Sequence, residues 1–216
     1  MTRQETALKI PVGKVVVEGN LAIPSGAEGI VVFAHGSGSS RFSPRNQYVA
    51  KEFNEAKIGT LLFDLLTTEE EEQDMFTAEY RFNIELLAER LIGATECLKK
   101  DNRTRNYAFG YFGASTGAAA ALIGAAKLPN DISAVVSRGG RPDLAAGYLP
   151  QVVAPTLLLV GGLDTEVIKL NRMAMAQMTA EKKLVIIPGA THLFEEAGKL
   201  EEVAKASKDW FLSYLK

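Results

Sequence analysis

The sequence has very little of what small domains use for cross-links or metal sites. Its 216 residues include one cysteine, Cys97, and two histidines, His35 and His192. A single cysteine excludes an intrachain disulfide. One cysteine and two histidines are also too few for the four ligands of a structural zinc site. We therefore expect a fold held by its hydrophobic core, with no metal and no cofactor.

Excess charge and long apolar runs are also missing. The formal net charge is −2, which indicates neither a nucleic-acid footprint nor a basic membrane surface. No run reaches the ~18 apolar residues that cross a bilayer, and Met1–Lys9 has no apolar core of signal-peptide length. We expect a cytoplasmic protein with neither nucleic acid nor membrane as a partner. The sequence leaves its oligomeric state open.

Apolar residues make up 47% of the chain. This is enough for the core of one sizeable domain, which we expect to span residues 1–216. Short runs rich in β-branched and aromatic residues are predicted strands: Ile30–Ala34, Thr60–Phe63, Tyr107–Phe112, Ile132–Ser137, Thr156–Val160 and Leu184–Ile187. They are continuously apolar, which is typical of central parallel strands covered on both faces.

Predicted helices separate most of these strands: Arg45–Ala56, Ala78–Lys100, Ser115–Lys127, Glu166–Met178 and Leu200–Leu215. Alternation of strand and helix predicts an α/β fold with a mostly parallel central sheet flanked by helices. Lys9–Val17 and Gly19–Pro24 are predicted to form an antiparallel hairpin at one edge of the sheet. The acidic run Glu69–Glu72 with Asp74 is interpreted as a solvated loop. The connection from Arg138 to Pro155 is short, so we expect little or no cap.

The strongest chemical signal is the segment Gly113–Gly117, which reads G-A-S-T-G between a predicted strand and an alanine-rich helix. This pattern is typical of a nucleophile elbow, where a tight turn exposes the serine hydroxyl at a helix N-terminus. The alternative is a plain glycine-rich turn. The strand–turn–helix context favours Ser115 as a nucleophile.

A serine nucleophile needs a base and an acid that orients the base. His192 follows the last predicted strand and is the expected base. Asp164 follows the strand before it and is the expected acid, although it could also cap the next helix. Asp143 is the alternative acid. The order Ser115, Asp164, His192 is the one used by α/β-hydrolases.

The segment His35–Gly38, H-G-S-G, follows the first core strand and is the expected oxyanion loop. Backbone N–H groups of Thr116 and Ser37 are the predicted donors to the developing oxyanion. A dinucleotide-binding loop is disfavoured because the third glycine of its fingerprint is absent.

These four motifs together resemble the α/β-hydrolase superfamily across nearly the whole chain, and most closely its dienelactone-hydrolase-like branch. In that branch such domains occur alone or fused to phosphoribosyltransferase-like domains. The name-giving enzymes use a cysteine nucleophile where this chain has Ser115. Cys97 lies in another helix and cannot replace it. The resemblance therefore implies a serine hydrolase acting on an ordinary carboxylic ester through an acyl-serine intermediate.

Specificity is less determined by the sequence. His35, Gly36, Arg41 and Arg138 are candidate substrate-binding residues, and either arginine could hold a substrate carboxylate. The alternative is that both arginines tie loops together through carbonyls and acids such as Asp64. Two further functions stay open. The same acyl-serine could pass its acyl group to another acceptor, or the chain could be a non-catalytic relative that binds a small ligand.

Overall fold

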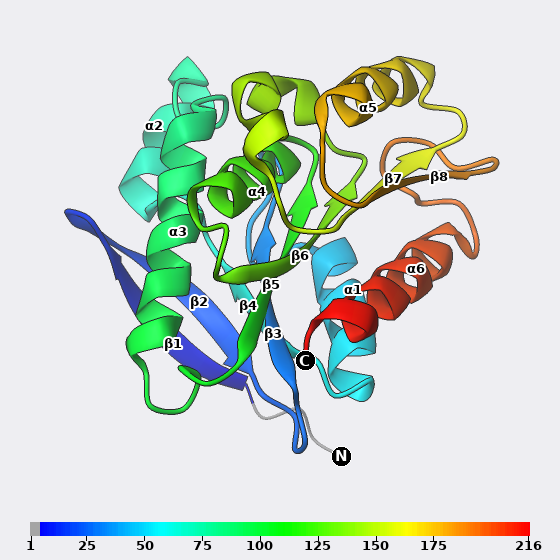
Figure 1. The fold of residues 1–216 in the computed structure, drawn as a ribbon. Coiled ribbons are helices and arrows are strands. Elements are labelled where there is room, and N and C mark those ends of the chain that lie inside the picture. The colour runs from blue at the N-terminus through cyan, green and yellow to red at the C-terminus, as the bar shows by residue number, and fades with distance from the viewer. Residues whose placement is uncertain (1–4) are drawn as a thin grey trace.

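The computed structural model describes residues 5–216 as one eight-stranded sheet flanked by helices (Figure 1). The strands lie in the order β1-β2-β4-β3-β5-β6-β7-β8. Their bounds are β1 Glu5–Val12, β2 Val15–Ala22, β3 Gly29–Ala34, β4 Gly59–Phe63, β5 Ala108–Ala114, β6 Ile132–Arg138, β7 Thr156–Gly161 and β8 Lys182–Ile187. β3 to β8 pair in parallel, whereas β1 and β2 pair antiparallel. This topology confirms the predicted fold class.

The central strands are apolar along their whole length because both faces of the sheet are covered. Every residue of β3, β4 and β7 is buried. A half-exposed strand would alternate between apolar and polar residues instead. The continuous runs in the sequence therefore correctly indicated the interior of a two-sided sheet.

Helices cover the sheet in two layers. Their bounds are α1 Pro44–Glu55, α2 Thr68–Thr77, α3 Ile84–Lys100, α4 Thr116–Lys127, the 3₁₀ segment η1 Pro142–Gln151, α5 Thr165–Gln177 and α6 Lys199–Tyr214. α1 and α6 lie together on one face (Figure 1), where the rings of Phe53 and Phe211 meet with centroids 5.5 Å apart. α3, α4, η1 and α5 cover the other face.

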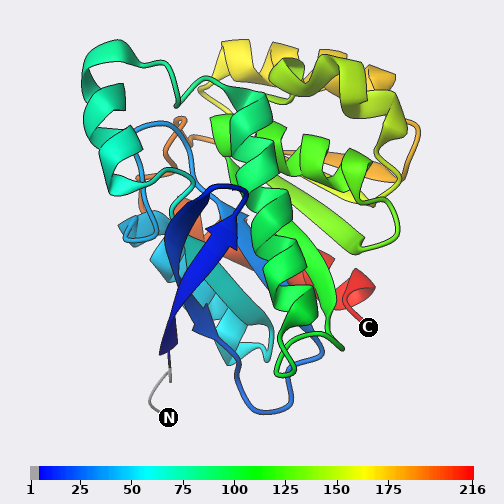
Figure 2. The same cartoon turned by 90° about the vertical axis from the view of Figure 1, so that its left-hand side faces the viewer.

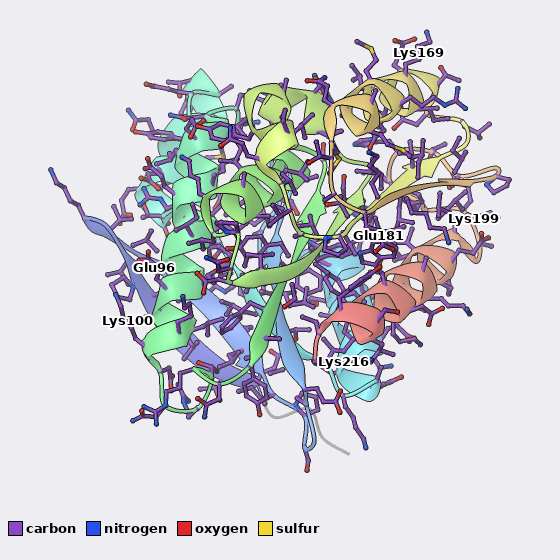
Figure 3. The ribbon with its side chains drawn as sticks, viewed as in Figure 1. Glu96, Lys100, Lys169, Glu181, Lys199 and Lys216 are labelled. Atoms are coloured by element: carbon purple, nitrogen blue, oxygen red, sulfur yellow. The ribbon has the colours of Figure 1, made fainter. Side chains whose placement is uncertain are left out.

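Charged side chains lie on the outer surface of the layer that contains α3 and α5. Glu96 and Lys100 extend outward from α3, and Lys169 extends outward from α5 (Figure 3). None of the helices among residues 5–216 has the length and apolar character needed to pass through a bilayer.

The N-terminal hairpin exists, but its strands were predicted with the wrong bounds. The turn lies at Gly13 and Lys14, between β1 and β2, and not at Glu18. Gly13 has φ +59°, a left-handed conformation that glycine adopts without steric cost. A two-residue turn with positive φ matches the twist of a hairpin, so this glycine sets the register.

The prediction of a loop for the acidic run Glu69–Glu72 is wrong, because these residues lie in helix α2. The Thr67 hydroxyl accepts from the Glu70 amide, and the Glu70 carboxylate accepts from the Thr67 amide. This capping box begins the helix. Three glutamates in the first turn stabilise it further, because their negative charges lie at the positive end of the helix dipole. α2 stands beside the upper end of α3 (Figure 2).

The helix predicted from Ala78 begins six residues later, at Ile84. Ala78 takes a left-handed conformation that ends α2. The buried carboxylate of Asp74 then accepts from the backbone amides of Tyr80 and Arg81, at 2.8 and 3.0 Å. These bonds fold residues 78–83 into a compact turn, and Asn83 caps α3.

Candidate active site

Ser115 lies in a strained turn between β5 and α4. Its φ of 51° and ψ of −119° are uncommon for a residue with a Cβ atom. The Ser115 amide donates to the Arg138 carbonyl at 3.1 Å. A Cβ atom added at Gly113 would lie 2.4 Å from the Ala118 Cα, and one at Gly117 would lie 2.2 Å from the Ala34 carbonyl oxygen. The turn therefore closes only with glycine at both positions.

Asp164 and His192 are brought together at the carboxyl ends of β7 and β8. The Asp164 Oδ2 lies 2.6 Å from the His192 Nδ1. Asp164 occupies the N-cap position of α5, but its side chain makes no capping hydrogen bond. The carboxylate is thus directed at the imidazole and not at the helix. An ionised carboxylate on Nδ1 fixes the tautomer that leaves Nε2 free to accept a proton.

The turn after β6 connects the serine to the histidine. The Arg141 amide donates to the Ser115 carbonyl at 3.1 Å. A Cβ atom added at Gly139 would lie 3.5 Å from the Nδ1 and Cε1 atoms of His192. Residues 139–141 therefore contact both partners. The Ser115 hydroxyl has no hydrogen-bond partner within residues 5–216, so it is free to meet a substrate and a base.

The predicted oxyanion donors also lie together. Thr116 is the first residue of α4, where backbone N–H groups have no partner within the helix. Its side-chain oxygen Oγ1 accepts from the Ser37 amide at 3.1 Å and lies 3.0 Å from the Ser37 hydroxyl. The Ser37 amide thus already has an acceptor. It can serve an oxyanion only by sharing or leaving the Thr116 side chain.

His35 is placed as a support for the oxyanion loop. Its Nε2 accepts from the Leu65 amide at 3.1 Å, so the proton is on Nδ1, which donates to the Gly36 carbonyl at 3.0 Å. Burial lowers the pKa of His35 more than the bond to Gly36 raises it. Both ring nitrogens of this neutral histidine are occupied. Gly36 lies against the nucleophile: a Cβ atom there would be 3.1 Å from the Ser115 Cβ.

The two arginines with open roles lie in different environments. The Arg41 side chain pairs with Asp64 and with Glu18, and its amide donates to the Asp64 Oδ1 at 2.8 Å. It therefore ties loops together. Arg138, at the end of β6, is buried without a carboxylate partner among the described residues.

Asp143, the alternative acid, pairs with the Arg141 side chain through two hydrogen bonds of 2.8 and 2.7 Å. Its carboxylate is therefore engaged away from His192, and Asp164 is the acid that the geometry presents to the imidazole.

A cavity of about 370 Å³ opens beside the oxyanion loop. It is lined by the loop from His35 to Ser39, by residues 64–66 after β4, and by α2 with Arg81. The Ser37 hydroxyl donates to the Arg81 carbonyl at 3.2 Å, which joins the loop to the turn after α2. The part played by α2 was missed in the sequence, although the spacing of Thr67 and Glu70 is the signature of a capping box.

Metal ligation finds no support in the part of the chain that the structure describes. No three His, Cys, Asp or Glu side chains there are grouped so that they could hold an ion.

The chain also matches a known protein family. The model of the "Dienelactone hydrolase family" matches residues 17–216. The chain belongs to the dienelactone hydrolase family. The structure of a dienelactone hydrolase from Anabaena variabilis is 57% identical, with a TM-score of 0.98 and 99% of each chain covered.

A more distant member of the fold is Est1E from Butyrivibrio proteoclasticus, solved with ferulic acid bound. It is 17% identical, with a TM-score of 0.82, and the match covers 96% of this chain and 99% of that one. At this identity the likeness between Est1E and this chain shows the fold alone.

A curated relative from Mycobacterium tuberculosis carries the name "Putative phosphoribosyl transferase" and is 53% identical over 212 residues. The match covers 98% of this chain but 47% of the relative. The chain thus spans about half the length of the curated relatives it matches.

Proposed function

We propose that this hydrolase-family chain cleaves small carboxylic esters through an acyl-serine intermediate, with Ser115, His192 and Asp164 as its catalytic residues. The observation that carries the proposal is the 2.6 Å contact between Asp164 and His192 beside a strained serine. Such a pair prepares an imidazole to accept the proton of a serine hydroxyl.

The reaction divides into two acyl transfers. His192 Nε2 removes the proton of Ser115 as Oγ attacks the ester carbonyl, and Asp164 stabilises the imidazolium. The Thr116 amide, at the N-terminus of α4, donates to the oxyanion. The imidazolium returns the proton to the leaving alcohol. A water, activated by the same histidine, then releases the acid and restores Ser115.

The cavity beside the oxyanion loop is the proposed place for one arm of the substrate. It lies against Ser37 and is bounded by α2. Phosphoribosyl transfer is not proposed for this chain, because the family matched over residues 17–216 is a hydrolase family and the named relative is about twice as long.

Fluorophosphonate labelling tests the proposal at the nucleophile. Wild-type protein should be labelled at one site, and Ser115→Ala should not. Ser25→Ala, in the exposed turn before β3, is the matched control and should label normally. A wild-type protein that is neither labelled nor active on p-nitrophenyl esters would be a binding protein and not an esterase.

A double-mutant comparison tests whether serine and histidine act together. Ser115→Ala and His192→Gln should each lower turnover of p-nitrophenyl butyrate by about 10⁴–10⁶. The double variant should be barely slower than either single one, because nucleophile and base form one unit. Fully multiplicative losses would remove His192 from the mechanism.

A further inference from the structure

Arg138 carries a buried positive charge that the protein leaves unpaired. Its residue exposure is 7%, and its Nε and Nη1 atoms have no hydrogen-bond partner within residues 5–216. Arg41, Arg90 and Arg141 each pair with a carboxylate. A buried charge without a partner is costly. A group that supplies negative charge to Arg138 would remove that cost.

A second guanidinium lies close by. Burial, and then the charge of Arg45, lowers the pKa of Arg138 to about 10. Arg45 is in the first turn of α1, where the helix dipole adds further positive potential. Its Nε is also buried without a partner, and its Nη1 binds Glu195 at 2.9 Å. The Glu195 side chain is 60% exposed and offers weak compensation.

Strand geometry places the Arg138 side chain on the face of the sheet that α1 covers. Side chains alternate along a strand. Ala134 and Val136 of β6 pack in the cluster that contains Val49 and Phe53 of α1. Arg138 follows them at the same two-residue spacing. It therefore points toward the N-terminal half of α1, where Arg45 begins the helix.

Asn46, next to Arg45, adds a further unused polar group at this end of α1. It is 2% exposed, and its Oδ1 has no partner in the described chain. An amide can turn to present its NH₂ group as a donor. Polar groups with unused hydrogen-bonding capacity on β6 and α1 are what a buried polar ligand requires.

This location is coupled to the candidate catalytic residues from two sides. The Arg138 carbonyl accepts from the Ser115 amide, and the next residue, Gly139, lies against the His192 ring. Arg45 holds Glu195, three residues after His192. A ligand between the two arginines would therefore contact the supports of both the nucleophile and the base.

We propose that Arg138 and Arg45 form a binding site for a small oxyanion, a carboxylate or phosphate group, beneath the loop that carries His192. The oxyanion is either a free anion or the acid group of the ester substrate; the second source rests on the proposed esterase function. Guanidinium groups suit both ligands because they form charge-assisted hydrogen bonds with planar and tetrahedral oxyanions.

Calorimetry and thermal melting of the full chain with inorganic phosphate and with succinate test the site directly. Wild-type protein should bind at least one anion saturably and melt at a higher temperature with it. Arg138→Met should weaken that binding by about tenfold or more, yet melt higher than wild type without anion, because it removes an unpaired charge. If Arg138 had only a structural role, Arg138→Met would lower the melting temperature instead. Arg141→Met, which breaks a partly buried pair with Asp143, is the matched control and should bind normally.

A second variant keeps the test decisive if Arg138→Met fails to fold. Arg45 lies at a half-exposed position, and Arg45→Gln should also weaken anion binding. Binding that is unchanged in Arg45→Gln, or absent in wild type for both anions, would overturn the proposal.

Matched esters distinguish the two sources. p-Nitrophenyl butyrate and the mono-p-nitrophenyl ester of succinic acid have the same chain length and differ by one carboxylate. If the substrate supplies the anion, wild type should prefer the succinate ester, succinate should compete with it, and Arg138→Met should lower kcat/KM for the succinate ester more than for the butyrate. If a free anion binds, phosphate should bind without competing. Normal butyrate hydrolysis without anion binding contradicts the site alone, and anion binding without hydrolysis contradicts the esterase alone.

Discussion

At the scale of single residues, the two histidines are distinguished by their partners. His35 uses both ring nitrogens within the fold, toward Leu65 and Gly36. His192 uses Nδ1 toward Asp164 and has no described partner at Nε2. Only the second can accept a proton from Ser115 without losing a structural bond. The division of roles therefore follows from hydrogen bonding, although both histidines follow core strands.

Asp164→Asn tests the acid. The amide can still bond to His192, but it favours the wrong tautomer, and turnover should fall about 10⁴-fold as in other serine triads. Steady-state kinetics with p-nitrophenyl butyrate measure the loss, and circular dichroism checks the fold. Asp143→Asn is the control and should keep near-normal turnover, since its carboxylate serves Arg141. The reverse outcome would place the acid after β6.

At the scale of elements, α2 and the turn after it form the boundary of the cavity. Asp74 holds this unit: its Oδ2 accepts from the Arg81 Nε at 2.5 Å while Oδ1 takes two backbone amides. Burial raises the pKa of the Asp74 carboxyl, but the bonds from Arg81 and Tyr80 outweigh it and lower the pKa overall. The wall of the cavity thus depends on one ionised side chain.

Asp74→Asn should loosen α2. The amide loses the charge that binds Arg81, at a local cost of about 1–3 kcal/mol. We expect faster hydrogen exchange over residues 68–83 and a higher KM for short esters, with the remaining chain protected as before. Glu71→Gln, at an exposed position on α2, should leave hydrogen exchange over residues 68–83 unchanged. Uniformly faster exchange across the whole chain would instead make Asp74 a global support.

The cavity also predicts acyl-chain selectivity. At about 370 Å³ it lies near the lower end of ligand pockets. Esters with acyl chains of roughly two to six carbons should be preferred. A series of p-nitrophenyl esters measures this, and Ser115→Ala supplies the background rate. Faster hydrolysis of a sixteen-carbon ester than of the butyrate would contradict it.

At the scale of the whole molecule, the two helical layers bury a continuous sheet, and one titratable group within that core links stability to pH. His35 is buried and neutral, with its pKa below the ordinary value of 6.5. The unfolded chain therefore takes up a proton at a pH where the folded chain does not. Stability from this group is complete above about pH 6.5 and decreases as pH falls below it.

His35→Gln tests this dependence. We expect urea unfolding at pH 5, 6, 7 and 8 to show that the free energy of unfolding of wild type falls by up to about 1.4 kcal/mol per pH unit below pH 6.5. The His35→Gln variant should not show this decrease. His192→Gln is the matched control, since the chain has no other histidine, and its half-exposed position should leave the acid loss in place. Equal pH slopes in all three proteins would contradict the prediction.

Local patterns in the sequence were sufficient to predict the mostly parallel sheet and to name the candidate site residues. Continuous apolar runs indicated strands covered on both faces, and G-A-S-T-G indicated the turn at Ser115. The bounds of β1, β2 and α3 were wrong because Gly13 and Asp74 act through a turn and through contacts six and seven residues away. Such interactions have no periodic signature in the sequence.

The tertiary structure decided the partners. The order of residues suggested that Asp164 serves His192, but only packing at the ends of β7 and β8 places their atoms 2.6 Å apart. From the sequence alone, Arg41 and Arg138 were equal candidates for binding a substrate carboxylate. Folding brings Asp64 and Glu18 to Arg41 and brings Arg45, a like charge, to Arg138. Sequence fixes which groups exist and which strand each follows, whereas charge compensation depends on which distant segments meet, and this the fold alone determines.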